Sequence, residues 1–297
     1  MMCQDFLDRF ILVEYNGLKY PEGYSAQIHE VAAHFDKDSI CPEGAYSLHT
    51  EYSYRQRNFD SDQISCFSVL RESHKDYVPQ LWKSAAWAQE FADYIISLTR
   101  DHIAPSVIEV HPPFNDYCSL DDFSERYRVF EESVHSEYPE TMIVIENRAG
   151  TVYRGGRFLF GKAMEIAALC ELIKQNNLKL GIVLDFPQLL TAENIDPLKF
   201  KVKEYQTAID TILPYRNLIK GIHIWGKKKS ATGRWVAHSG NFDTYFGGNA
   251  EIKQLFVSGI HQICSDNQMR FLVPEINSGT EDLACIINDL LYTSTGK

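Results

Sequence analysis

Short runs of apolar residues alternate along the chain with longer segments whose apolar positions recur every three or four residues. Short runs are typical of buried strands, and the longer pattern is typical of amphipathic helices. Apolar runs at 10–15, 45–49, 107–111, 141–146, 180–185, 219–223 and 271–275 predict seven strands. An eighth strand is expected at 234–239, where the pattern is least regular.

Helical spacing is clearest between residues 81 and 98, and it recurs at 120–135, 159–175, 198–213, 250–264 and 281–291. The segment 25–35 also has helical spacing, through Ile28, Val31, Ala32 and Phe35. Residues 50–75 have no clear period, so we expect a functional loop or a partly disordered one there. Alternating strands and helices favour a parallel sheet, and their number favours one (β/α)8 barrel spanning residues 1–297.

Composition narrows the class of protein. The chain has 297 residues, of which 44% are hydrophobic and 23% charged, as in soluble globular proteins. A net charge of −11 disfavours indiscriminate attraction to nucleic acid, although it leaves room for a local basic patch. Seven scattered cysteines without a C-x-x-C pair favour reduced thiols. Signal-peptide and membrane-spanning patterns are absent, so we expect a cytoplasmic protein with no membrane partner.

Six of the predicted strands end in a histidine or an acidic residue. Those residues are His49, His111, Glu146, Asp185, His223 and Glu275. One such residue alone is most often a solvated strand end or a helix cap, which is the interpretation we give to Glu14. Six together are harder to explain in this way, because a parallel barrel gathers strand ends at one rim. Three imidazoles and three carboxylates there indicate a divalent metal site.

Five short motifs contain five of these six candidate ligands. They are 49–52 (HTEY), 111–113 (HPP), 146–150 (ENRAG), 185–188 (DFPQ) and 223–227 (HIWGK). In this order they resemble the H-x-x-Y, H-P-G, E-N-T-A-G, D-x-x-H and H-x-N-D-S-K motifs of endonuclease IV, an apurinic/apyrimidinic endonuclease family of xylose isomerase-like barrels. Glu275 resembles the family's final glutamate, and His238 with the glycines after it resembles its D-x-H-x-x-x-G segment. The resemblance runs from residue 45 to residue 277, and ENRAG is its most specific match.

The resemblance implies which residues would hold metal ions. A first ion would be held by His49, His111 and Glu146. A second would be held by Glu146, Asp185, His223 and Glu275, so that Glu146 bridges the two ions. Imidazole and carboxylate ligands together favour Zn²⁺ or Mn²⁺.

The family's third ion would need Gln188, Val236 and His238, where the family has His, Asp and His. Valine cannot coordinate a metal, and a glutamine amide is a poor zinc ligand. We therefore expect two ions, with His238 as a weaker candidate ligand.

The chemistry implied is hydrolysis of a phosphodiester, which two ions about 3.5–4 Å apart can promote. Glu146, Asp185 and Glu275 are then the expected catalytic residues. The expected substrate-binding residues are Tyr52, Gln188, Lys227, Lys229 and Arg234. Tyr52 lies where the family inserts an aromatic ring near DNA, and Lys227-Lys228-Lys229 with Arg234 forms a basic cluster able to receive phosphate.

Several of these residues have a structural interpretation as well. Tyr52 is as readily a barrel-rim aromatic, and a basic cluster is more often a solvated loop. Trp225 and Trp235 are expected to wall the pocket or to pack in the core. Six further histidines are expected at the surface, namely His29, His34, His74, His102, His135 and His261.

Three classes of function follow. The first is a two-metal phosphodiester hydrolase, with nucleic acid or a small phosphate ester as its substrate. The second is a sugar isomerase or epimerase, because Glu146, Asp185, His223 and Glu275 also resemble the one-metal site of that branch, where two glutamates move protons. The third is a barrel that binds metal or ligand without turnover.

Overall fold

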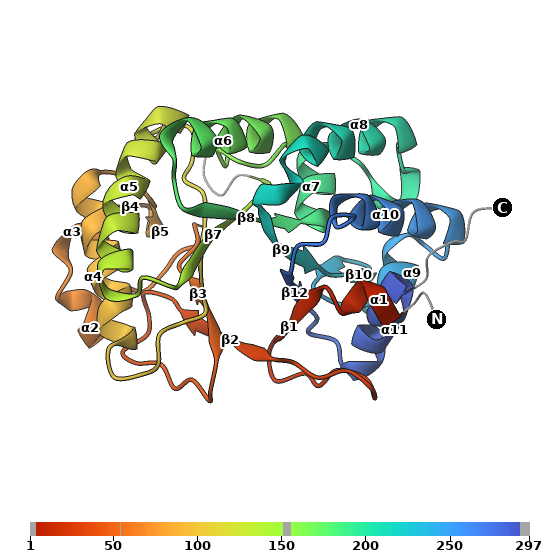
Figure 1. Ribbon diagram of the computed structural model, residues 1–297, viewed down its shortest axis with the longest axis horizontal. Helices are drawn as coiled ribbons and strands as arrows, with labels where there is room; N and C mark the ends of the chain where they lie inside the picture. The colour runs from red at the N-terminus through yellow and green to blue at the C-terminus, as the bar shows by residue number, and fades with distance from the viewer. Residues whose placement is uncertain (1–3, 54, 151–155, 292–297) are drawn as a thin grey trace. The chain divides into compact units, whose positions relative to one another are not determined.

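Eight strands form a closed barrel in a computed structural model that describes residues 4–53, 55–150 and 156–291 (Figure 1). The strand order around the barrel is β1-β12-β9-β8-β7-β6-β3-β2, and neighbouring strands pair in parallel. The strands are β1 (Phe10–Glu14), β2 (Ile28–Ala33), β3 (Tyr46–Thr50), β6 (Val107–Val110), β7 (Met142–Glu146), β8 (Leu180–Asp185), β9 (Ile219–Ile224) and β12 (Arg270–Pro274). The predicted barrel is confirmed.

Helices follow most of these strands, close to the predicted positions. They are α4 (Ala85–Thr99), α5 (Leu120–Glu137), α6 (Ala163–Asn176), α7 (Phe186–Ala192), α8 (Val202–Ile212), α9 (Phe242–Tyr245), α10 (Ala250–Ile263) and α11 (Thr280–Leu291), with α1 (Gln4–Leu7) before β1 and the short η1 (Pro197–Lys199) and η2 (Leu213–Leu218) around α8. The connections at 15–27 and 34–45 contain no helix. Both contain a Pro-Glu-Gly turn sequence, which disfavours helix.

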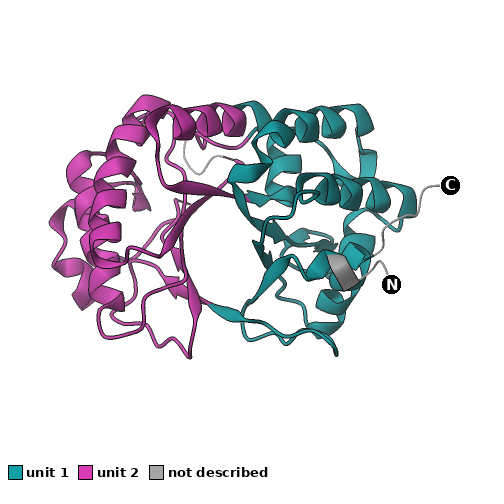
Figure 2. Ribbon diagram, viewed as in Figure 1, with its two compact units in different colours: residues 1–29, 162–164, 184–297 teal, residues 30–161, 165–183 magenta. Residues whose placement is uncertain are grey.

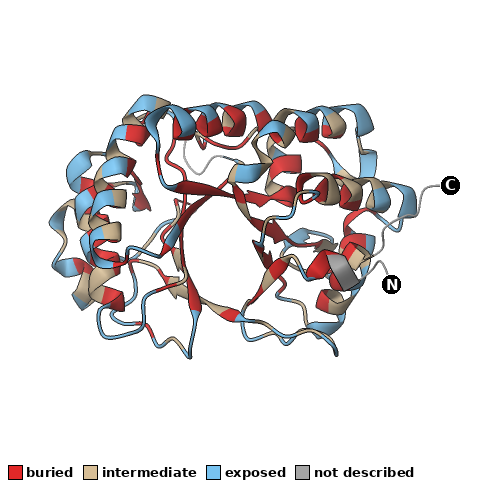
Figure 3. Cartoon of the chain, viewed as in Figure 1, coloured by how far each residue is buried: buried red, intermediate tan, exposed pale blue. Residues whose placement is uncertain are grey.

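Local sequence explains why α5 begins where it does. The side chain of Ser119 accepts a hydrogen bond from the backbone N–H of Asp122, and the Asp122 carboxylate accepts one from the backbone N–H of Ser119. This capping box satisfies two amide groups that the first helical turn leaves without partners. Residues such as Phe123 and Tyr127 are buried on one side of α5, whose other side is exposed (Figure 3).

The prediction of a helix at 25–35 is wrong, because this segment contains strand β2. Val13 of β1 pairs with Ile28 in parallel register, and Ile28 packs against Val13 and Val273. A window this short fits helical spacing by chance, and its β-branched residues suit a strand equally well. Pairing with β1 decides the conformation, so β2 is the eighth barrel strand.

The strand predicted at 234–239 exists, but it lies outside the barrel. β11 (Trp235–Ala237) pairs antiparallel with β10 (Lys227–Lys229), and Val236 lies opposite Lys228. Only residues 225–234 separate β9 from β11. A parallel strand needs a crossover of about a dozen residues or more, whereas an antiparallel hairpin needs only a short turn.

The base of this hairpin requires a glycine at position 226. A Cβ atom there would lie 2.5 Å from the carbonyl oxygen of Gly240 and 2.7 Å from that of Asn241. Gly226→Ala is therefore expected to lower the free energy of unfolding by about 1–3 kcal/mol, as overpacking does. Urea denaturation measures this, with exposed Thr232→Ala as a control that should stay within about 0.5 kcal/mol. An unchanged midpoint in Gly226→Ala would contradict the close approach.

Contacts within the chain divide it into two compact units (Figure 2). Unit 1 comprises residues 1–29, 162–164 and 184–297, and unit 2 comprises residues 30–161 and 165–183. Strands β1, β9 and β12 belong to unit 1, and β3, β6 and β7 belong to unit 2. Each unit contains one of the two groups of candidate ligands described below.

The core of unit 2 is rich in aromatic rings. Trp82 is fully buried, with its ring centroid 5.3 Å from that of Phe123, 5.4 Å from that of Phe130 and 5.9 Å from that of Phe91. These rings join α4 to α5, which lie side by side (Figure 1). The indole N–H of Trp82 donates a 2.7 Å hydrogen bond to the carbonyl oxygen of His111, so this core also anchors a candidate ligand.

The polar segment 50–75 is largely ordered. It contains α2 (Asp62–Ser65) and α3 (Ser68–Glu72), and it leads into the small sheet of β4 (His74–Lys75) and β5 (Val78–Pro79). Tyr54 lies outside the described residues.

Among the described residues, the structure contains no helix with the length and apolar character that a membrane span requires. The cysteines at 41, 66, 118, 170, 264 and 285 are free thiols, as expected, and Cys3 lies outside the described residues.

Candidate metal centre

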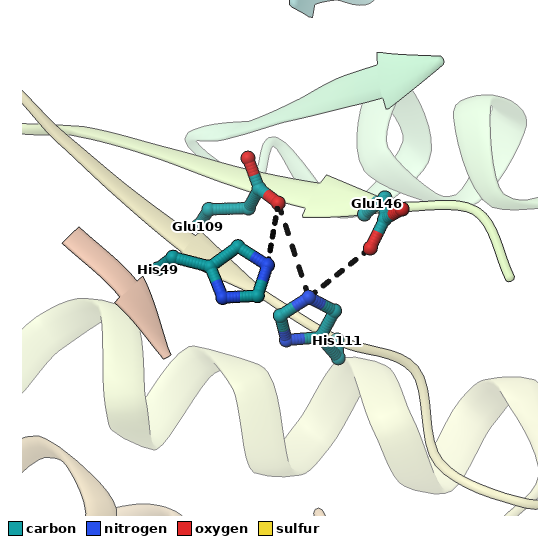
Figure 4. Close-up of side chains that lie close together, drawn as sticks. All are labelled: His49, Glu109, His111 and Glu146. Carbon is teal, nitrogen blue, oxygen red and sulfur yellow. Dashed lines mark ion pairs between the residues drawn. The ribbon is translucent and has the colours of Figure 1, made fainter. Parts of the chain in front are cut away.

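Unit 2 brings four possible metal ligands together, and we call them the first ligand group: His49, Glu109, His111 and Glu146 (Figure 4). Their ligand atoms all lie within 4.8 Å of one another. Nε2 of His111 lies 3.1 Å from Oε2 of Glu146 and 3.8 Å from Oε1 of Glu109, and Nε2 of His49 lies 3.6 Å from the same Glu109 oxygen. The group is almost entirely buried, so its charges are poorly hydrated.

The hydrogen bonding of His111 indicates that this group suits a cation. Nδ1 of His111 lies 3.1 Å from the backbone carbonyl oxygen of Glu51. A carbonyl only accepts, so Nδ1 carries a proton and Nε2 is the ring nitrogen left to bind a cation. Nε2 is buried and has no hydrogen-bond partner among the described residues, yet it faces two carboxylates. Two imidazoles and two carboxylates that converge in a buried site are a ligand set that fits a divalent metal.

Glu51 holds this arrangement in place, although the sequence does not mark it as functional. Its fully buried carboxylate accepts a 2.8 Å hydrogen bond from Nε of Arg57 and 2.9 Å hydrogen bonds from two backbone amides. A buried carboxylate with such partners is costly to displace. The carbonyl group that orients His111 is therefore attached to a rigid residue, which makes Glu51 a positioning residue.

Two guanidinium groups lie over the ring of Tyr52. That of Arg57 is 4.7 Å from the ring centroid and that of Arg148 is 4.9 Å away. Nη1 of Arg148 also donates a 3.0 Å hydrogen bond to Oε2 of Glu146. Arg148 stands where the E-N-T-A-G motif has threonine, so this chain places an additional positive charge beside the candidate metal bridge. The role of Tyr52 in stacking a base stays a prediction.

Unit 1 holds a second ligand group, consisting of Asp185, His223 and Glu275. One ligand atom of each lies within 4.8 Å of the others, and all three residues are buried. Nδ1 of His223 is 3.4 Å from Oε1 of Glu275. Asp185 ends β8, His223 lies in β9 and Glu275 directly follows β12, as the strand-end pattern predicts.

Hydrogen bonds fix the orientation of the Asp185 carboxylate. Oδ1 accepts a 2.8 Å hydrogen bond from the backbone N–H of Gln188, which caps α7, and Oδ2 accepts a 2.8 Å hydrogen bond from the indole N–H of Trp225. Trp225 is buried and stacks on His238, with ring centroids 4.5 Å apart. Trp225 thus packs in the core, one of the two expected placements, and its indole also orients a candidate ligand.

The three positions implied for a third ion differ in their surroundings. Nδ1 of His238 lies 3.2 Å from the backbone oxygen of Glu275 and 3.3 Å from its Oε2. Val236 is 43% exposed on the β10–β11 hairpin, and Gln188 lies in the first turn of α7. The absence of a third ion stays a prediction.

The basic cluster divides into side chains with different surroundings. Nζ of Lys227 lies 5.1 Å from the Trp225 ring centroid, and burial lowers the pKa of Lys227, an effect that the charge of Asp185 opposes. Nζ of Lys229 lies 5.5 Å from the Trp235 ring centroid, and Arg234 is exposed. Among the predicted phosphate-binding residues, Lys227 is thus the one whose pKa responds to the charge of Asp185 in the second ligand group.

Glu109 and His34 are missed by the sequence reasoning. Glu109 stands two residues before His111, and residues so spaced on a strand face the same side, which is the signal that could have found it. Burial lowers the pKa of His34 to about 4, and its ring centroid lies 5.2 Å from that of Tyr52. His34 and His261, predicted at the surface, are half-buried, and His261 stacks on Phe6 with ring centroids 3.9 Å apart.

No protein-family model matches the chain, and no curated protein matches it. Among solved structures, it is similar to the probable 3-DHS dehydratase AsbF of Bacillus anthracis, with 11% identity, 83% of this chain and 76% of that chain covered, and a TM-score of 0.43. It is also similar to the Ignisphaera aggregans GH53 catalytic domain, with 10% identity, 86% and 79% covered, and a TM-score of 0.43. A psychrophilic glycoside hydrolase family 10 endo-β-1,4-xylanase is similar at 10% identity, with 84% and 89% covered and a TM-score of 0.38.

Proposed function

We propose that the chain is a divalent-metal-dependent hydrolase that cleaves a phosphodiester, using one ion at each ligand group and Glu146 as the bridge. The observation that carries the proposal is the first ligand group, in which Nε2 of the buried His111 lies 3.1 Å and 3.8 Å from oxygens of two carboxylates. A one-metal isomerase does not need this group. Its presence favours the hydrolase over the isomerase alternative.

The residues have separate roles in this proposal. Bound divalent ions would supply Lewis acidity that activates water and stabilises charge developing on phosphate. His49, Glu109 and His111 would hold the ion of the first ligand group, and Asp185, His223 and Glu275 would hold the ion of the second.

The surrounding side chains orient these ligands. Trp225 keeps Asp185 in a single orientation, and Arg148 neutralises part of the charge on Glu146. Lys227, Lys229 and Arg234 attract the phosphate group. Burial of Asp185 and Glu146 strengthens their interactions with Trp225 and Arg148.

Metal content is the first measurable consequence. Protein purified without chelator is expected to carry about two Zn²⁺ or Mn²⁺ ions per chain, because each ligand group suits one ion. Elemental analysis measures this number. Three ions per chain would contradict the loss of the third site, and a protein that cannot be loaded with either metal would rule out the proposed function.

Activity is the second consequence. With Mn²⁺ or Zn²⁺ the protein is expected to cleave bis(p-nitrophenyl) phosphate or a duplex with an abasic site, and EDTA is expected to abolish cleavage until metal is restored. Release of p-nitrophenolate follows cleavage of the first substrate, and gel electrophoresis follows cleavage of the duplex. If the protein instead exchanges a ketose C–H proton with solvent deuterium and cleaves no phosphodiester, the isomerase alternative replaces the hydrolase.

A further inference from the structure

A cavity of about 470 Å³ lies within unit 1, between the start of the β10–β11 hairpin and the segment that joins α7 to η1. Its lining includes Ile195, Pro197, Leu198, Lys227, Trp235 and Tyr245. One ammonium group therefore stands among apolar and aromatic walls. This volume is in the usual range for small-molecule sites.

Lys227 is the charged group of this cavity that lacks a partner. Its Nζ makes no hydrogen bond or ion pair with any residue that the structure describes, and it lies 5.1 Å from the ring centroid of Trp225 and 5.8 Å from that of Tyr245. The neighbouring Lys228, by contrast, pairs with Asp282 at 3.6 Å. Burial disfavours the charged ammonium, and the charge of Asp185 offsets this only in part, so a bound anion would lower the remaining cost.

The remaining walls suit a flat apolar group. Trp235 is 45% exposed and Leu198 is 50% exposed, so both present apolar surface that a ligand in the cavity can contact. Burial raises the pKa of Tyr245, so its phenol stays neutral. Stacking of a planar ring on an aromatic side chain contributes about 1–3 kcal/mol.

We infer that this cavity binds a small phosphate ester carrying a planar ring, with the phosphate on Lys227 and the ring against Trp235. The inference rests on the proposed function, because the bound ester would be the substrate or product of that reaction. Lys227 approaches the ring of Trp225, whose indole N–H holds Asp185, so a phosphate there would lie beside the second ligand group.

Charge favours a small ester over a long duplex. The chain carries a net charge of −11, and Asp196 adds a carboxylate to the cavity lining. A polyanion needs many positive contacts along its backbone, whereas a single phosphate needs one. The ligand class is thus a small phosphate ester that resembles a mononucleotide, either the product or part of the substrate.

Calorimetric titration of the full chain tests the inference in EDTA, so that binding is measured without turnover. The probes are adenosine monophosphate, adenosine and inorganic phosphate. The variants are Lys227→Gln and Trp235→Ala. Lys199→Gln is the matched control, because Lys199 is an exposed lysine of η1 that does not line the cavity.

Wild type is expected to bind the monophosphate at least about tenfold more tightly than adenosine or phosphate alone. Lys227→Gln should abolish the preference over adenosine, Trp235→Ala should weaken monophosphate binding at least about fivefold, and Lys199→Gln should bind as wild type does. Equal affinity for adenosine and its monophosphate in wild type, or no binding of the monophosphate, overturns the inference. So does a preference that survives in Lys227→Gln, or binding unchanged in Trp235→Ala.

The two proposals fail separately. Binding with this pattern but without phosphodiester cleavage in the presence of metal rejects the hydrolase and keeps the ligand class. Metal-dependent cleavage without binding at this cavity rejects the ligand class and keeps the hydrolase.

Discussion

Glu146→Gln is expected to lower metal-dependent turnover by at least about 100-fold. Removing a residue that merely hydrogen-bonds to a metal ligand typically costs about 10–100-fold, and Glu146 is proposed to be a ligand itself. The substitution preserves the shape of the side chain and removes the negative charge proposed to bridge two cations. The fold should survive, because barrel stability comes from the core and not from the rim. Steady-state kinetics, elemental analysis and circular dichroism measure the three quantities.

The control for this substitution is Glu137→Gln, which removes the same charge from an exposed position at the end of α5. It should retain turnover and metal content. If Glu146→Gln turned over normally with two ions bound, Glu146 would not be a metal bridge.

Asp266→Asn is expected to produce the largest loss of stability, about 3–5 kcal/mol, because it leaves a buried guanidinium without its counterion. Arg270 is only 1% exposed, and its Nη1 and Nη2 lie 2.6 Å and 2.9 Å from the two oxygens of Asp266. Nε of Arg270 also donates a 3.0 Å hydrogen bond to the carbonyl oxygen of Ile219, which ties β12 to β9. Urea denaturation measures the change.

The Asp266–Arg270 pair also makes the stability of the protein depend on pH. Burial alone would raise the pKa of Asp266, but the hydrogen bonds and charge of Arg270 outweigh it and the pKa lies below its usual value. A lowered pKa means that the stabilisation is fully present above the unfolded value, near about 3.9, and is lost as the pH falls through the folded value. Asp266→Asn should remove this part of the acid sensitivity.

A surface pair is the control for both effects. Lys174 and Glu171 lie 3.7 Å apart with both side chains exposed, so Glu171→Gln should change stability by less than about 1 kcal/mol. Equal losses from Asp266→Asn and Glu171→Gln would show that burial does not make the Arg270 pair important.

The strands that carry candidate ligands were predictable because each is a buried apolar run ending in a polar residue. Asp185 ends β8 and Glu146 ends β7, as the pattern indicates. A side chain at a strand end is placed by the strand itself, so a local pattern is enough to locate it. The roles of these residues in catalysis stay predictions.

Other features depend on contacts between distant residues. β2 resembles a helix in sequence and becomes a strand because it pairs with β1. β11 has the composition of a strand, but the short connection after β9 places it in a hairpin. No local rule could decide either case.

The residues that orient the candidate ligands could not be predicted from the sequence either. The indole of Trp225 bonds to Asp185 across 40 positions, and the carbonyl group of Glu51 orients His111 across 60. Sequence spacing cannot predict such bonds, because the barrel alone determines which strand ends become neighbours. Glu109 is different, because its position two residues before His111 was visible.

Anomalous diffraction from crystals grown with Mn²⁺ or Zn²⁺ tests the two-ion centre most directly. The expected result is one peak among His49, Glu109, His111 and Glu146, and a second peak among Asp185, His223 and Glu275. A peak at the second group alone would contradict the two-ion hydrolase and favour a one-metal isomerase. No peak at either group with metal in excess would contradict a metal centre of any kind.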